Sequence, residues 1–271
     1  MNVYANLERL KRALRIAASV TTHDAYLLEL SEAASRSVEN FCQRHFYTVS
    51  EVRYFGVLNT GRVLLDDLLS VSAVGADSEE DGTFDGEAWV EGTDYVLFPR
   101  DKWPRTWMAP HKAGEKSLSL DGDYLKVTGV WGFGDGQSGS PWRGLGVNLT
   151  VADGTATSAT VSASGAVSAG DTLKVESEQV YVESVSGTTL TIRRGMNGTT
   201  GAAHAAAAVS RALYPEPVIR FVVALVSEEF GKRTARGVRQ EMLGTHQVVY
   251  EEMDERIYRR ALGVYRRVRA N

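Results

Sequence analysis

The sequence predicts an α+β protein with a helical bundle body, a small antiparallel β-sheet and a separate all-β inserted domain. Three observations lead to this fold class. Amphipathic helical patterns occupy both ends of the chain, short strand-like segments fill the region from 48 to 131, and a weakly charged stretch alternates at period two from 147 to 212. We therefore expect residues 1–146 and 213–271 to form a discontinuous body, and residues 147–212 to form the inserted domain.

Four helices are expected in the body. Leu7, Leu10 and Leu14 recur at three- and four-residue steps, which is typical of an amphipathic helix ending near residue 18. A second helical pattern begins after Thr22 or His23, residues that suit a helix start. This second pattern covers about 24–45, and the other two cover about 216–230 and 251–269.

Strands are expected in two groups. Segments such as "VSEVRYFG", "DYVLFP" and "YLKVTGVWGFG" are short and separated by Gly, Asp and Pro, which favours a small antiparallel sheet or barrel. In the inserted domain, apolar residues alternate, as at Leu190 and Ile192, and "SGTT" suits a hairpin. The alanine tract at 202–208 is predicted as a short, marginal helix of a turn or two, because Gly201 and Val209 flank it.

Composition excludes several classes of protein. The 271 residues carry a formal net charge of −4, so no global attraction to nucleic acid or anionic lipid is expected. Cys42 is the single cysteine, which excludes an intrachain disulfide and a cysteine-based zinc site. The beginning of the chain does not resemble a signal peptide, and the longest apolar run, at 218–226, is too short to span a membrane. We expect synthesis in the cytoplasm of the host and no membrane partner.

No catalytic pattern is found in the sequence. The five histidines are scattered without the spacing of a metal site, and the serines lack the G-x-S-x-G motif of hydrolases. Cys42 falls on the apolar side of a predicted helix, which indicates a buried thiol rather than a nucleophile. We therefore predict no catalytic residue, no cofactor, no bound metal and no enzymatic activity.

Two segments stand out as candidate interfaces. In "KWPRTWMAP", Trp103, Trp107 and Met108 are residues that anchor interfaces, although they equally suit the core of the small sheet. The last predicted helix begins with acids and continues with arginines, which suits the helix dipole, a solvated surface or an acidic partner. The candidate contact residues of that helix are Arg256, Arg259, Arg260, Tyr265, Arg266, Arg267 and Arg269.

This order of elements resembles the head-tail connector, or adaptor, proteins of long-tailed bacteriophages. The resemblance depends on "LERLKRALRI", "HDAYLLELSEAASRSVENFCQRHF", "LLDDLLSVSAVGAD", "GTDYVLFPRDKWP", "YLKVTGVWGFGD" and "PEPVIRFVVALVSEEFGKR". These segments lie mostly within 1–135 and 213–271. The β-rich region at 147–212 departs from the family pattern and looks like an added module.

The resemblance implies a non-enzymatic virion protein at the head-tail junction. Such subunits form a ring, expected here in about twelve copies, beneath the portal protein. DNA would pass through the ring, without sequence-specific binding, to the next neck or tail-completion protein. By position, the arginines from 256 to 269 would contact the portal or a neighbouring subunit. The alternative reading is a virion decoration protein whose β module binds a ligand, a glycan or the capsid.

Overall fold

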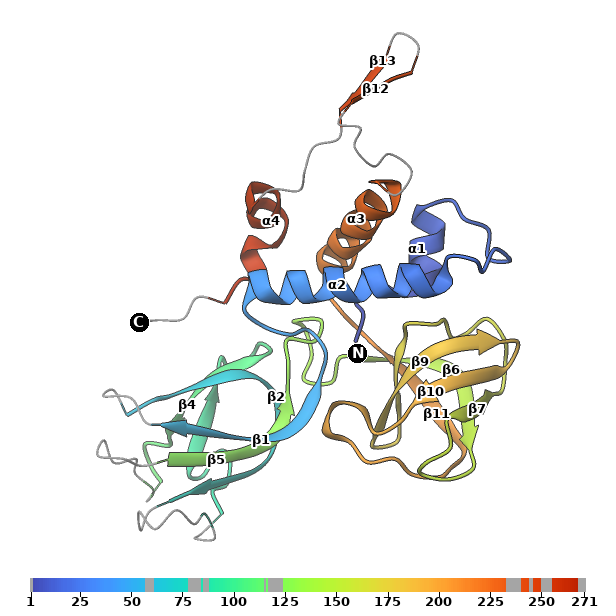
Figure 1. Ribbon diagram of the computed structural model, residues 1–271. Coiled ribbons are helices and arrows are strands. Elements are labelled where there is room, and N and C mark those ends of the chain that lie inside the picture. Colours follow the sequence, from blue (N-terminus) through green and yellow to red (C-terminus); the bar gives the residue numbers. More distant parts are fainter. Residues whose placement is uncertain are drawn as a thin grey trace.

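The computed structural model shows a protein that is mostly β, so the predicted helical bundle body is wrong. A five-stranded sheet and a closed six-stranded barrel account for most of the regular structure, and the helices form one layer above them (Figure 1). Amphipathic helices give a stronger periodic signal in the sequence than short strands do, so the sequence pattern overstates the share of helix. The described residues are 2–56, 61–77, 84, 88–114, 116, 124–232, 240–243, 246–249 and 255–267.

The helical layer is organised around helix α2 (Asp24–Cys42), and it includes α1 (Leu7–Ala13), α3 (Glu216–Lys232) and α4 (Glu255–Leu262). Its core combines helix residues with the segment that follows α2. The fully buried side chains of this core include Leu10, Leu27, Val38, Phe46, Val222 and Leu262.

Two of the helices are shorter than predicted. Helix α1 ends at Ala13, because Arg15 takes a left-handed conformation with φ 56° and turns the chain. Helix α4 ends at Leu262, and Gly263–Tyr265 continues as a 3-10 turn named η2. Between α3 and α4 lies a two-stranded hairpin, β12 (Gln240–Leu243) with β13 (His246–Val249).

The five-stranded sheet is antiparallel, with the strand order β1-β5-β2-β4-β3. The strand-like segments "GRVLLDD" and "LLSVSAVGAD" together form one long central strand, β2. One face of the sheet packs an apolar core around Trp131, Met108 and Leu125, which are fully buried. The strands are β1 (Val49–Gly56), β2 (Val63–Ala76), β3 (Tyr95–Phe98), β4 (Arg105–Pro110) and β5 (Tyr124–Trp131).

The barrel closes in the order β10-β7-β6-β11-β8-β9. Its first strand begins at Trp142, so the predicted domain boundary at 147 falls inside that strand. The alternating apolar residues of this region, such as Leu173, Val180 and Leu190, point into its core and are fully buried. The strands are β6 (Trp142–Val151), β7 (Ser158–Val161), β8 (Thr172–Val175), β9 (Glu178–Ser186), β10 (Thr189–Arg193) and β11 (His204–Ala212).

The alanine tract predicted as a marginal helix is instead the start of strand β11. This strand pairs with β6 on one side and with β8 on the other, so two strands supply the backbone partners that close the barrel. Tertiary pairing therefore overrides the helix propensity of alanine. An irregularity between His204 and Ala207, with φ 54° at Ala206, marks where the strand bends.

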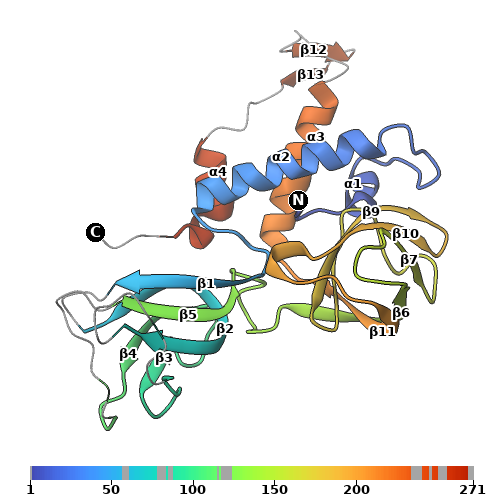
Figure 2. The ribbon, with the colours of Figure 1, turned by 60° about the horizontal axis from the view of Figure 1, so that its bottom comes forward.

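The barrel is joined to the rest of the molecule by a buried network of polar side chains. Asn2 donates to Asn197 at 2.8 Å, and Asn197 donates to Gln179 at 2.8 Å. Gln179 in turn donates to the hydroxyl and the carbonyl oxygen of Thr48, just before β1, at 3.1 and 3.2 Å. Thr172 donates to Asn2 at 3.1 Å. The N-terminal segment thus lies between the barrel and the helices, and both views show it there (Figures 1 and 2).

Candidate interaction surfaces

Helix α4 presents several of the predicted contact residues on its surface. Arg256, Arg259 and Arg260 are exposed, and Arg259 pairs with Glu255 one turn earlier, at 2.8 Å. Arg260 forms no ion pair with any residue that the structure describes. Just after the helix, Val264 is 88% exposed, the highest value among the large apolar side chains described. An exposed apolar residue therefore lies in a strongly basic segment.

The residues after α4 are partly used within the fold. The Tyr265 ring packs edge-on against Phe46 and Phe133, with centroid distances of 6.0 and 5.7 Å. The Arg266 guanidinium lies 5.6 Å from the ring centroid of Phe41. Of the predicted contact residues, Arg266 is exposed, Tyr265 is half-buried, and Arg269 lies outside the described residues.

Arg267 binds the five-stranded sheet rather than solvent. Its guanidinium donates to the Asp66 carboxylate and, at 2.7 Å, to the carbonyl oxygen of Leu65 in β2. Its backbone N–H donates to the carbonyl oxygen of Cys42, at the end of α2, at 2.8 Å. Arg53 of β1 also pairs with Asp66, at 2.8 Å. Arg267 therefore holds the C-terminal segment at the junction of the sheet and the helices.

A second carboxylate lies at the same junction. Asp67 is almost fully buried, and Arg44, which follows α2, pairs with it at 3.5 Å. Burial raises the pKa of Asp67, and the neighbouring Arg44 and Arg267 offset only part of this effect. The sheet is thus attached to the helical layer by acids of β2 and arginines from outside the sheet.

The predicted anchors Trp103, Trp107 and Met108 belong to the sheet and its turn. Met108 is fully buried in the sheet core, which agrees with the core interpretation for this residue. Trp107 is half-buried and stacks on Phe98, with centroids 3.9 Å apart and planes 6° from parallel. Trp103 is half-buried, and the Arg105 guanidinium lies 4.6 Å from its ring centroid. The two tryptophans retain some exposed surface, whereas Met108 has none.

A buried acid organises the turn between β10 and β11. Glu178 is fully buried and accepts two hydrogen bonds from Arg194, both at 2.7 Å. The backbone N–H groups of Gly195 and Ala202 also donate to it, at 3.0 and 3.1 Å. His204 lies 2.8 Å from Glu178 through one ring nitrogen and 2.8 Å from Glu176 through the other. Every hydrogen bond to Glu178 comes from within the barrel, which is typical of a structural network.

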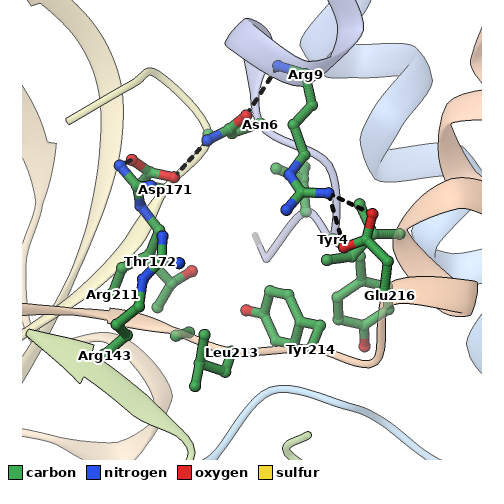
Figure 3. A pocket seen from close by; sticks show the side chains of 14 residues that line it. Tyr4, Asn6, Arg9, Arg143, Asp171, Thr172, Arg211, Leu213, Tyr214 and Glu216 are labelled. Atoms are coloured by element: carbon green, nitrogen blue, oxygen red, sulfur yellow. Dashed lines mark hydrogen bonds and ion pairs between the residues drawn. The ribbon is translucent and has the colours of Figure 1, made fainter. Parts of the chain in front are cut away.

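A pocket of about 210 Å³ lies where the N-terminal segment, the barrel and α3 meet (Figure 3). Arg143 and Arg211 lie on its barrel side, and Arg9 and Glu216 lie on its helical side (Figure 3). Arg9 donates to both carboxylate oxygens of Glu216, at 3.0 and 2.9 Å. The apolar side chains that complete the wall include Val3, Leu213 and Ile219.

The acid on the barrel side of the pocket, Asp171, already has several partners. Asp171 pairs with Arg211 at 2.8 Å and accepts hydrogen bonds from the Asn6 side chain and the Ser168 N–H, both at 2.8 Å. Burial raises the pKa of Asp171, and Arg211 and Asn6 oppose that shift. Arg143 has no ion pair with any residue of the described ranges. The pocket therefore carries one arginine whose charge no neighbouring acid compensates.

Sequence reasoning did not identify this pocket. Its charged residues come from positions 9, 143, 171, 211 and 216, which are too far apart in the sequence to form a motif. Of these residues, only Arg9 lies in the first predicted helix, whose amphipathic pattern does not indicate a pocket. Only the pairing of β6 with β11 brings Arg143 opposite Arg211.

Two further observations concern function. Within the described residues, no group of three His, Cys, Asp or Glu side chains is placed to hold a metal ion. Among the helices of the same residues, none has the length and apolar character needed to cross a membrane. Compared with protein-family models and with curated proteins, the sequence gives no match. The function is therefore argued from the surfaces described above.

Proposed function

We propose that this chain is a structural virion protein, a head-tail adaptor that forms a ring under the portal and lets DNA pass toward the neck and tail. The observation that carries this proposal is the surface at α4, where Val264 is 88% exposed next to the exposed Arg260 and Arg266. Arginine is enriched in protein interfaces, and an exposed apolar side chain gains free energy when a partner covers it. The surface thus has the composition of a contact site.

The anchoring of α4 supports the same proposal. Leu262 is fully buried in the helical core, and Arg267 ties the following segment to β2 and α2. The exposed side chains between these two attachments are held on a fixed element. A fixed surface loses less conformational entropy on binding than a flexible one, which favours assembly into a defined ring.

The arrangement of layers also fits a subunit with partners on opposite sides. The helices lie between the β12–β13 hairpin on one side and the sheet and barrel on the other (Figure 1). A subunit of this form offers different elements toward the portal and toward the tail. Its formal net charge of −4 suits a channel that DNA must pass through without being retained.

The alternative of a glycan-binding module receives no support from the barrel. Its aromatic residues are Trp142 and Tyr181. Tyr181 is buried, and the half-buried Trp142 ring lies 5.8 Å from the Lys174 ammonium. These side chains do not form the exposed aromatic platform on which sugars stack, so we propose a single function.

The test compares two double variants of the full chain. Val264→Asp with Arg260→Glu changes the surface at α4, and Val90→Asp with Arg100→Glu makes the same changes at exposed positions in the loops on either side of β3. Native mass spectrometry and negative-stain microscopy would follow each protein alone and with the portal protein of the same phage. Substitution is preferable to truncating the chain after Glu255, because truncation would also remove the buried Leu262.

We expect closed rings, or a complex with the portal, for the natural protein and for the sheet variant. The α4 variant should remain folded, as judged by its thermal unfolding, and should fail to assemble. A natural protein that stays monomeric both alone and with the portal would refute the adaptor proposal. Normal assembly of the α4 variant would refute the role assigned to α4.

A further inference from the structure

The pocket between the N-terminal segment, the barrel and α3 contains an unusual pair of like charges. Arg143 of β6 and Arg211 of β11 are direct cross-strand partners. Side chains in such positions lie about 5 Å apart at their Cβ atoms, and like charges directly opposite each other are destabilising. Solvent or an anion must offset the repulsion, and Arg143 is exposed to solvent. One anion, Asp171, is already present for Arg211.

The remaining charges show that the neutralisation is incomplete. Glu216 is bound by Arg9 and also by Arg220, at 3.4 Å, so its carboxylate is already shared between two arginines. Asp171 is enclosed by its own donors and serves Arg211. Arg143 is left with its guanidinium at the pocket and with no acid of its own. The pocket is therefore positively charged.

Unused hydrogen-bonding capacity accompanies this charge. The Nε atom of Arg211 is buried and has no hydrogen-bond partner among the described residues. Leaving a charged donor buried and unpaired is costly, so such a group marks a place where a ligand oxygen is favourable. The guanidinium group of each arginine presents a planar set of donors that matches the oxygens of a carboxylate.

We infer that this pocket binds the carboxylate of an aspartate or glutamate side chain on an acidic peptide segment of a partner protein. The cavity of about 210 Å³ is smaller than the pockets of about 300–1,000 Å³ that hold small-molecule ligands. It is large enough for one side chain, and Val3, Leu213 and Ile219 offer apolar contacts to its methylene groups. This inference does not depend on the adaptor proposal.

A neighbouring groove extends the binding surface for such a segment. Arg9, Arg12, Ala13, Ile219, Arg220 and Val223 line this groove between α1 and α3, whose volume is about 250 Å³. Arg9 and Ile219 line the pocket as well, so the two depressions are adjacent. The groove has an apolar floor and arginines at its rim. The complementary partner is therefore an acidic segment that carries an apolar residue near its acid.

The first experiment measures peptide binding by fluorescence anisotropy with the intact protein. The probes are short labelled peptides with one central glutamate and a leucine placed one to four positions after it. At least one spacing should give saturable binding, and the matched glutamine peptide should bind about tenfold more weakly, since it lacks the charge. Equal binding of the glutamate and glutamine peptides, or no binding at any spacing, would overturn the inference.

Variants assign the binding to the pocket. Arg143→Gln should weaken the glutamate peptide about tenfold and leave the folded state as stable as before, because it also relieves the like-charge pair. The matched control is Arg100→Gln, which removes an exposed arginine of the sheet region and should bind normally. If Arg143→Gln binds as tightly as the natural protein, the pocket is not the site.

A second experiment separates the peptide from a free anion and tests the groove. Inorganic phosphate at millimolar concentration should raise the unfolding temperature less than the glutamate peptide does. Stabilisation by phosphate with no peptide binding would identify a free-anion site and overturn the inference. Ala13→Glu adds a negative charge to the exposed edge of the groove and should weaken peptides with leucine more than matched peptides with serine. An equal effect on both series would exclude the groove.

Discussion

The barrel and the five-stranded sheet are both antiparallel, yet they are stabilised in different ways. The barrel has no open edge and packs a core of Val, Leu, Ile and Ala side chains without aromatic residues. The sheet is open at β1 and β3, and its core includes Trp89, Tyr95 and Trp131. Closing a sheet removes the exposed backbone groups of its edges, whereas an open sheet needs other elements beside it.

The acids of the two units also have different partners. In the barrel, Glu178 accepts every one of its hydrogen bonds from residues of the same unit, including Arg194 and His204. In the sheet, Asp66 and Asp67 pair with arginines that include Arg44 and Arg267, which come from beyond α2 and α4. Glu178 closes a loop within its own barrel, whereas Asp66 and Asp67 attach the sheet to the helical layer. Asp171 links the barrel to the N-terminal segment through Asn6, so both β units have polar attachments to the rest of the molecule.

The largest expected effect is the loss of the barrel's buried charge. Glu178→Gln leaves Arg194, whose side chain is 7% exposed, without its counter-ion inside the protein. Breaking a buried ion pair in this way costs about 3–5 kcal/mol of the free energy of unfolding. Chemical denaturation followed by circular dichroism would measure it, with hydrogen exchange to show whether β9 to β11 open first.

The control for this substitution lies on the outside of the same strand. Glu183→Gln removes the partner of Arg193, which is 54% exposed, and should cost less than about 1 kcal/mol. Equal effects of the two substitutions would contradict the importance of the Glu178 network. Opening of the sheet before the barrel in Glu178→Gln would contradict its local character.

Acid should weaken the barrel before the sheet. Burial alone would raise the pKa of Glu178, but the hydrogen bonds from Arg194, Gly195, Ala202 and His204 outweigh it and lower the pKa to about 2. Because this value lies below the 4.5 of an unperturbed glutamate, the ionised form stabilises the folded state. The contribution, about 3 kcal/mol, is complete above pH 4.5 and is lost as the pH falls toward 2.

Asp67 of the sheet has the opposite dependence on pH, because burial raises its pKa above the ordinary value. A raised folded-state pKa means that protonation of this acid favours the folded state. Hydrogen exchange between pH 5 and pH 3 should therefore show β9 to β11 losing protection before β2 and β5. In Glu178→Gln the acid sensitivity of the barrel should disappear, and its persistence would refute the assignment to Glu178.

Local periodicity explains what could be predicted from the sequence. The strand expected at 49–56 is observed as β1, and the alternating residues Leu173, Val175, Val180, Val182, Leu190 and Ile192 are all buried in the barrel core. These patterns are encoded within a few residues, so the chain alone carries them. The alanine tract shows the limit, because its strand conformation depends on β6 and β8, which are distant in sequence.

For the candidate contact residues too, the sequence shows only what is local in the chain. The arginines of α4 were visible as a run, but the sequence did not show that Arg267 is used inside the fold or that the helix ends before Gly263. The basic pocket could not be predicted at all, since Arg143 and Arg211 become neighbours only when the barrel closes. The sequence thus shows where charged residues are concentrated, but the fold determines which of them contact one another.

The smallest of these effects concerns the attachment of the sheet. Asp66 is 39% exposed, so Asp66→Asn should lower the free energy of unfolding by only about 1 kcal/mol while weakening the hold on Arg267. Glu51→Gln is the matched control, because Glu51 also pairs with Arg53 and is 41% exposed but does not touch Arg267. Hydrogen exchange of residues 255–267 should therefore increase in Asp66→Asn and stay unchanged in Glu51→Gln. Unchanged protection in both variants would show that the hydrogen bonds from Arg267 to Leu65 and Cys42 are enough to hold the C-terminal segment in place. The ion pair with Asp66 would then contribute little to the attachment of the sheet to the helices.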